Sequence, residues 1–87
     1  MDRLTRKNAA GVWELDPERL PEAAERLARY EDFVEALPRE LGQISAELEA
    51  LRGAGKEKTV QFRERMARKL TDRSLLLRLE EAGLTGR

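Results

Sequence analysis

The amino-acid sequence predicts an all-α fold: an antiparallel helical hairpin with a coiled-coil-like seam, a short N-terminal extended or hairpin appendage, and assembly of copies into an oligomeric bundle. Three observations predict it. Apolar residues between positions 20 and 51 alternate spacings of three and four, as do coiled-coil a and d positions. A glycine-bearing turn then precedes a second apolar-periodic segment. Leu and Ala, which favour helices, must supply most of the buried surface, because the chain has only one Trp, one Tyr and two Phe.

The size and composition of the chain bound what it can do. Its 87 residues predict a single domain over residues 1–87, and a chain this small gains most easily from oligomerisation. It has no Cys and no His, which excludes thiolate and imidazole metal sites, Cys nucleophiles and His general bases. We therefore expect no enzyme activity and no cofactor. The sequence offers no signal peptide or membrane span, so we expect a cytoplasmic protein with no membrane partner.

The charges divide unevenly along the chain, although the net charge is zero. Residues 1–51 hold 7 Lys and Arg against 12 Asp and Glu, a balance of −5, and residues 52–87 hold 10 against 5, a balance of +5. Halves of opposite sign attract each other within a hairpin or between subunits. The alternative is a basic surface reserved for an anionic partner.

Residues 1–15 are predicted to form the appendage. Arg3–Lys7 and Val12–Leu15 suit two short strands, and Gly11 in the turn between them is free to adopt positive φ. Because an isolated two-stranded hairpin is marginal in water, we expect it to dock through Val12 and Trp13. The alternative is a frayed arm.

The first helix is predicted over residues 20–52, after a short turn capped by Asp16, and it carries the seam. A broad apolar stripe of this kind is typical of bundles rather than two-stranded zippers. The ten seam residues are Leu20, Ala23, Leu27, Tyr30, Val34, Leu37, Leu41, Ile44, Leu48 and Leu51. Pro38 kinks or breaks this helix, and the unbroken apolar register across it favours a kink.

A turn over residues 53–58 is predicted to lead into a second helix over residues 59–83, with Thr59 as its N-cap and Gly83 at its end. One apolar face combines Phe62, Met66, Leu70 and Leu77, with Val60 and Ala67 beside them. Three further leucines, Leu75, Leu76 and Leu79, fall outside that face. Either the helix is interrupted near residues 71–74, or its last turns are buried on two sides by a second subunit.

The turn and the second helix also carry the candidate ligand-binding residues. Backbone N–H groups at a helix N-terminus can hold a phosphate, and neighbouring lysines supply charge. The turn is no Walker A loop, because Ala50 stands where that motif needs Gly. The predicted ligand-binding residues are Lys56, Lys58, Thr59, Arg63, Arg65 and Lys69. The alternative is a plain hairpin turn with solvated lysines, followed by a basic stripe that pairs with acidic residues of another subunit. This stripe of the second helix consists of Lys58, Arg65, Arg68, Lys69 and Arg73.

Several short segments resemble a known group of proteins. The opening Met1–Thr5 (MDRLT), the segment Leu27–Asp32 (LARYED), Gly55–Arg63 (GKEKTVQFR) and Ala82–Leu84 (AGL) are similar to short phage and prophage proteins of Gram-positive bacteria. Those proteins begin M-[DE]-R-L-T, carry L-A-x-Y-E-D and have a G-K-x-K-T segment. The resemblance implies a setting rather than an activity: a small accessory protein in a bacterial host cell, directed at a host system such as defence.

Two functions of different classes remain open at this point. The first is a non-enzymatic oligomeric bundle that binds an anionic ligand, either a nucleotide or a nucleic acid, and so acts against host defence by sequestration. The second is a structural or regulatory adaptor that binds a host or phage protein through its helices. No aromatic residues interleave the basic stripe, so base stacking is unsupported.

Overall fold

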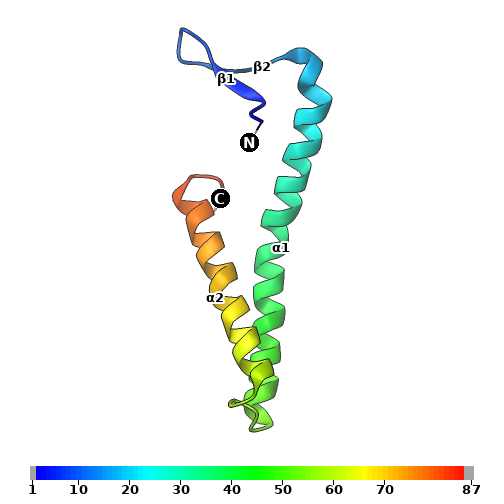
Figure 1. The fold of residues 1–87 in the computed structure, drawn as a ribbon, viewed down its shortest axis with the longest axis vertical. Coiled ribbons are helices and arrows are strands. Elements are labelled where there is room, and N and C mark those ends of the chain that lie inside the picture. Colours follow the sequence, from blue (N-terminus) through cyan, green and yellow to red (C-terminus); the bar gives the residue numbers. More distant parts are fainter. Residues whose placement is uncertain (1, 86–87) are drawn as a thin grey trace. The chain divides into compact units, whose positions relative to one another are not determined.

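A computed structural model describes residues 2–85 of the chain, so positions 1, 86 and 87 of the predicted domain lie outside the described residues. The elements are strand β1 (Thr5–Lys7), strand β2 (Trp13–Leu15), a 3-10 turn η1 (Pro17–Arg19), helix α1 (Leu20–Gly53) and helix α2 (Val60–Glu81). Figure 1 shows these elements in order of colour along the chain. The chain divides between Asp32 and Phe33, inside α1, into two compact units, and each unit is described by itself.

In the first unit, the predicted strands form a short antiparallel hairpin. Thr5 pairs with Leu15 and Lys7 with Trp13. The Asn8 side-chain oxygen accepts hydrogen bonds from the backbone N–H groups of Ala10 and Val12, at 2.9 and 3.0 Å. Gly11 completes the turn with φ of 78°, which confirms the predicted need for a residue free to take positive φ.

The prediction that Val12 and Trp13 anchor this appendage is wrong. Both side chains are more than half exposed. Trp13 instead lies between two cations, with the Arg3 guanidinium 4.8 Å and the Lys7 ammonium 5.1 Å from its ring centre.

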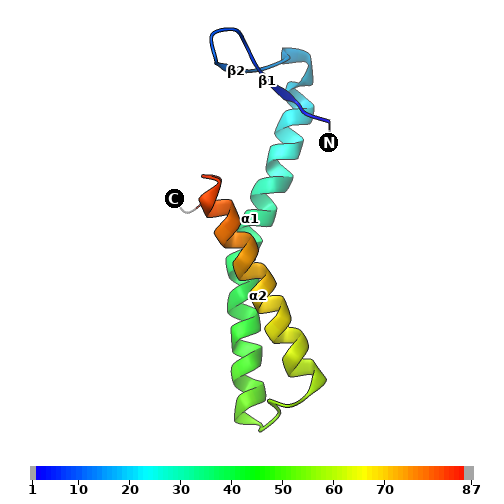
Figure 2. The same cartoon turned by 60° about the vertical axis from the view of Figure 1, so that its left-hand side comes forward.

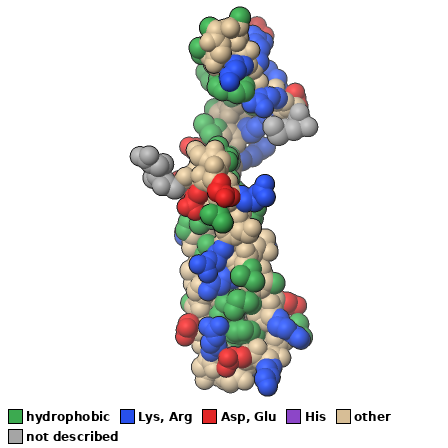
Figure 3. Space-filling model, turned by 90° about the vertical axis from the view of Figure 1, so that its left-hand side faces the viewer, with side chains coloured by type: hydrophobic (Ala, Val, Ile, Leu, Met, Phe, Trp, Pro, Cys, Tyr) green, Lys and Arg blue, Asp and Glu red, His purple; other side chains and the backbone are tan. Residues whose placement is uncertain are grey.

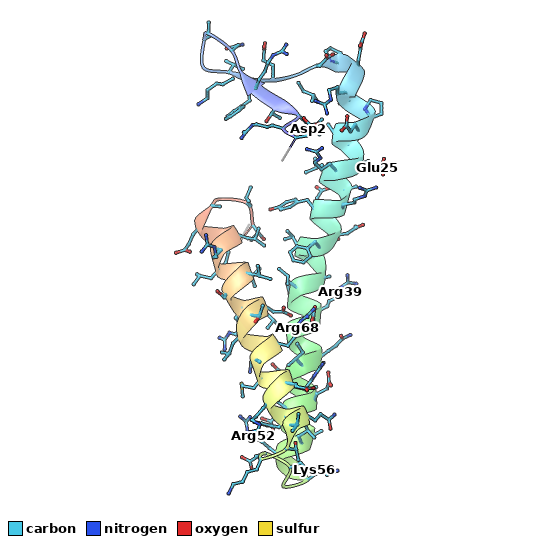
Figure 4. All side chains as sticks on the ribbon, in the orientation of Figure 1. Asp2, Glu25, Arg39, Arg52, Lys56 and Arg68 are labelled. Carbon is cyan, nitrogen blue, oxygen red and sulfur yellow. The ribbon has the colours of Figure 1, made fainter. Side chains whose placement is uncertain are left out.

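Polar contacts hold the start of the chain to α1. The Arg19 Nη2 group donates to the Asp2 carboxylate at 3.1 Å, and the Arg26 Nη1 group donates to the Asp2 carbonyl at 2.8 Å. The position of Asp2 beside the first turns of α1 is visible in Figure 4. Charge-assisted hydrogen bonds therefore replace the expected apolar docking.

The predicted turn capped by Asp16 precedes α1, and Pro38 does not break the helix. Asp16 caps η1 by accepting a hydrogen bond from the Glu18 N–H at 3.0 Å. Helix α1 then runs unbroken from Leu20 to Gly53 with Pro38 inside it. Pro38 removes one backbone hydrogen bond of the helix, and the adjacent Leu37 is buried.

In the second unit, α1 turns back into α2 to form the predicted antiparallel helical hairpin, and Figures 1 and 2 both show the two helices side by side. The Lys56 N–H donates to the Leu51 carbonyl at 2.8 Å and the Gly55 N–H donates to the Arg52 carbonyl at 3.0 Å. These bonds, with Gly55 at φ of 71°, form a Schellman ending. Thr59 is the N-cap of α2, as predicted, and accepts from the Phe62 N–H at 3.2 Å.

The core of the hairpin is small. The buried apolar residues are Leu37, Ile44 and Leu48, all from the C-terminal part of the seam. Half-buried side chains of α2 line up over one face of that helix at Phe62, Met66, Leu76 and Leu79. This half of the predicted seam is therefore covered, and α2 covers it.

The predicted apolar face of α2 is only half right. Phe62 and Met66 are half-buried as expected, but Leu70 and Leu77 are 60% and 56% exposed. Leu76 and Leu79, which the sequence placed outside the face, are half-buried instead. Helix α2 is also uninterrupted between residues 71 and 74. The face turned toward α1 includes a charged residue, Asp72, and that charge made the correct stripe look broken.

Two leucines in the N-terminal part of the seam are open to solvent, whereas Ala23 and Tyr30 in the same part are half-buried. Leu20 is 58% and Leu27 is 55% exposed, although both keep the a/d spacing. Neither helix, as far as the structure describes the chain, has an apolar stretch sufficient to cross a bilayer.

Candidate functional site

The turn between the helices places two lysines beside the N-terminus of α2. Lys56 and Lys58 are exposed, and neither joins an ion pair with any described residue. Thr59 lies between them and α2, and its hydroxyl donates to the Lys56 carbonyl at 2.7 Å while capping the helix. Arg52 is near this end as well, 5.4 Å from the centre of the Phe62 ring (Figure 4). The turn thus gathers positive charge at a helix N-terminus, where the helix dipole also favours anions.

The other predicted ligand-binding residues do not share that surface. Successive helical residues are 100° apart, so Arg63 faces almost opposite to Arg65. Arg63 is exposed, whereas Arg65 and Lys69 are half-buried on the side that faces α1. The six predicted ligand-binding residues therefore lie in three places. Lys56, Lys58 and Thr59 lie at the turn, Arg63 lies on the side of α2 away from α1, and Arg65 and Lys69 lie on the inner face of α2, toward α1.

Ion pairs between the helices occupy part of the basic stripe. The Arg65 Nη1 atom lies 3.8 Å from the Glu47 carboxylate, and the Arg68 Nε atom lies 2.6 Å from the Glu40 carboxylate. These pairs join the basic half of the chain to its acidic half, as the charge division predicted for a hairpin. Arg65 and Glu47 also border a shallow open groove along α1 whose lining is mainly polar.

A buried carboxylate next to these pairs escaped the sequence analysis. Asp72 is 2% exposed, and its Oδ1 atom lies 3.4 Å from the Arg68 Nε that also holds Glu40. Its Oδ2 atom is buried without a hydrogen-bond partner among the described residues. Arg68, whose place on α2 is labelled in Figure 4, thus bridges two carboxylates, one from each helix.

The environment of Asp72 changes its protonation. Burial is the largest cause that raises the pKa of the Asp72 carboxyl, and the nearby Glu40 charge raises it further, while Arg68 acts in the opposite direction. The hydrogen bond from Arg68 to Glu40 is the main cause that raises the pKa of the Arg68 guanidinium. The sequence signal for this cluster was the position of Asp72, ten residues after Phe62 and four before Leu76 on one helical face.

Two groups of charged residues make up the candidate site of this unit, one at the turn and one around Arg68. Within the described part of the chain, no three His, Cys, Asp or Glu side chains gather as a metal site would require. The Arg68 cluster joins two carboxylates and one guanidinium at the hairpin interface. The turn lysines remain available to an anion.

Comparison with protein-family models, with curated proteins and with solved structures finds no match for this chain. The function must therefore be argued from the fold and its surfaces.

Proposed function

We propose that this protein is a non-enzymatic helical adaptor that binds a host or phage protein by helix packing, and that copies of it assemble into an oligomeric bundle. The observation that carries the proposal is a pair of exposed leucines in the N-terminal part of the seam. Leu20 and Leu27 belong to the same a/d pattern as the buried residues Ile44 and Leu48, yet they are more than half exposed. Apolar ridges at a/d spacing are the surfaces on which partner helices pack.

The proposed setting is a bacterial host cell, as a phage or prophage accessory protein. The support for it is the sequence resemblance at the opening and LARYED segments. An adaptor needs no catalytic group, which agrees with the absence of Cys and His from the sequence.

Affinity capture from lysates of phage-infected cells tests the adaptor function. A tagged wild-type chain should retain a specific protein, and the double variant Leu20→Glu, Leu27→Glu should lose it, because charge on a packing ridge opposes burial. The matched control is Glu18→Gln with Glu31→Gln, which changes charge on exposed positions of the same unit. Retention that is equal for all three proteins would refute the role of this ridge.

A second candidate function is anion binding at the turn. It is favoured by the exposed Lys56 and Lys58 at the N-terminus of α2, neither of them neutralised by a carboxylate among the described residues. A nucleotide or the phosphate backbone of a nucleic acid would be held by the two ammonium groups and by first-turn backbone N–H groups. Arg63, Arg65 and Lys69 would add only long-range attraction.

Thermal melting with added ligand separates this candidate from the adaptor. A nucleotide present at about 100 times its Kd should stabilise the fold by about 2.7 kcal/mol at low salt. The variant Lys56→Ala, Lys58→Ala should lose that shift, while Lys69→Ala, on the inner face, should keep it. No shift with nucleotides or short nucleic acids would remove the anion-binding function and leave the adaptor proposal intact.

A further inference from the structure

Helix α2 has two apolar faces, and α1 covers one of them. The covered face runs through Phe62, Met66, Leu76 and Leu79. The second face, which we call the outer face, has heptad spacing and comprises Arg63, Ala67, Leu70, Ser74, Leu77 and Glu81. Its two leucines are among the most exposed apolar side chains of the structure, and its centre lies roughly 140° around the helix from the covered face.

The outer face of α2 points away from α1 and is exposed to solvent. Figure 3 looks at that side and shows apolar side chains lying in the open between basic and acidic ones. Every one of the six outer-face residues is exposed. A helix with two apolar faces at such an angle is typical of bundles in which each helix touches more than one neighbour.

We infer that the outer face of α2 binds the outer face of α2 in a second copy of this chain, with the two helices antiparallel. This inference rests on the proposed function, since it deepens the assembly part of it. In an antiparallel pair the a positions of one helix face the d positions of the other. Ala67 then faces Leu77 of the second copy, and Leu70 faces Ser74. Each layer combines a large and a small side chain, so the two helices can approach closely.

Charge complementarity selects this partner and this direction. At the two ends of the antiparallel contact, Arg63 faces Glu81 of the second copy. On one flank, Glu64 faces Arg78 of the second copy. Two-fold symmetry repeats both pairs, so that four opposite-charge pairs border the leucines. Arg63, Glu64, Arg78 and Glu81 take part in no ion pair among the described residues, and thus are available to a second copy.

A parallel pair would reverse these interactions. Arg63 would face Arg63 of the second copy, and Glu81 would face Glu81. On both flanks Arg73 would face Arg78. Like charges placed together at an interface oppose association. The antiparallel pair brings together only one couple of like charges, Arg73 and Arg73 of the second copy.

Sedimentation equilibrium over a range of protein concentrations tests the inference with the full chain. The wild type should form a dimer, and Leu70→Lys with Leu77→Lys should be a monomer with unchanged far-UV circular dichroism, because both side chains are exposed. The matched control Gln43→Lys with Gln61→Lys adds the same charge at exposed positions away from the outer face and should remain a dimer. A wild type that is monomeric at every concentration, or a lysine variant that still dimerises, would overturn the inference.

Charge exchange tests the direction. Arg63→Glu alone and Glu81→Arg alone should each dimerise about tenfold more weakly. An equimolar mixture of the two variants should recover the wild-type affinity, since each then meets its opposite charge at both ends. A mixture no tighter than its components would overturn the antiparallel arrangement. The adaptor function is tested at Leu20 and Leu27, so either proposal can fail without the other.

Discussion

At the scale of single residues, Asp72 is the position where the hairpin departs from a simple apolar interface. Its carboxylate is buried between the helices, with one oxygen near Arg68 and the other without a partner among the described residues. A buried acceptor left without a partner costs about 1 to 3 kcal/mol. Asp72 therefore limits the stability of the hairpin.

The raised pKa of Asp72 has a defined consequence for stability. Between the ordinary pKa of 3.8 and the higher pKa in the folded chain, the folded state binds more protons than the unfolded state. The contribution of Asp72 to the free energy of unfolding therefore falls as the pH rises through this window. Asp72→Asn should be more stable than the wild type by about 1 kcal/mol at pH 7, and this difference should shrink toward pH 4.

Urea denaturation of both proteins at several pH values measures this difference. Glu35→Gln removes a carboxylate from an exposed position of α1 and is the control for the loss of one carboxylate. A variant Asp72→Asn that is less stable than the wild type at pH 7 would show that the pair with Arg68 outweighs the burial of the charge.

The apolar residues of the seam differ in what they contribute. Ile44 is 1% exposed, so Ile44→Ala removes packed atoms and leaves a cavity, and it should cost about 2 to 5 kcal/mol. Leu27 has the same seam spacing but is open to solvent, so Leu27→Ala should cost less than about 1 kcal/mol for the isolated protein. Urea denaturation checks both values, and equal losses would contradict the division of the seam into buried and exposed residues.

At the scale of elements, the sequence predicted the hairpin, both strands, the N-cap at Thr59 and the glycine endings. These features depend on local chemistry: a capping hydroxyl, a positive φ, an apolar period. The inner face of α2 was predicted incorrectly because two stripes of this helix carry comparable apolar content. Asp72 interrupts the stripe that α1 actually covers, whereas Leu70 and Leu77 continue the other one. Only the position of α1 decides between them, and no local pattern encodes that position.

The candidate site shows the same limit. The position of Lys56, Lys58 and Thr59 at the start of α2 followed from the turn. The sequence could not separate Arg63 from Arg65 and Lys69, since the choice depends on which side of α2 meets α1. Arg68 bridges Asp72, which is 4 positions away on the same helix, and Glu40, which is 28 positions away on α1. Only tertiary packing brings Glu40 close to Arg68.

Replacement of a glycine by alanine should have opposite effects on stability at two positions, Gly42 inside α1 and Gly55 just after it. Gly55 has φ of 71°, a conformation that costs an L-residue about 1 to 2 kcal/mol, so Gly55→Ala should destabilise the protein by about that amount. Gly42 lies inside α1, and a Cβ added there would meet nothing within 4 Å. Gly42→Ala should therefore stabilise the protein by about 0.5 to 1 kcal/mol. Thermal melts of the two variants serve as controls for each other, and changes of equal sign would contradict the assigned backbone conformations.

At the scale of the whole molecule, the fully buried side chains among residues 2–85 lie in one of the two units. The buried residues Leu37, Ile44, Leu48 and Asp72 all belong to the second unit, from Phe33 onward. The first unit is held instead by a short sheet and by exposed polar contacts, such as those of Arg19 with Asp2 and Glu22. Exposed ion pairs contribute little, with typical values of 0 to about 1 kcal/mol. The two units should therefore differ in local stability.

Native-state hydrogen exchange should reveal that difference along α1. Amides of Ile44 and Leu48 lie under packed side chains and should exchange only through global unfolding. Amides of β1, β2 and the first turns of α1 should open at a free energy lower by about 2 kcal/mol or more, because few buried contacts are lost there. Addition of a protein that packs on Leu20 and Leu27 should raise protection in the first unit specifically. Uniform protection from Thr5 to Leu48 in the free chain would mean that both units open together. That result would contradict the predicted difference in local stability.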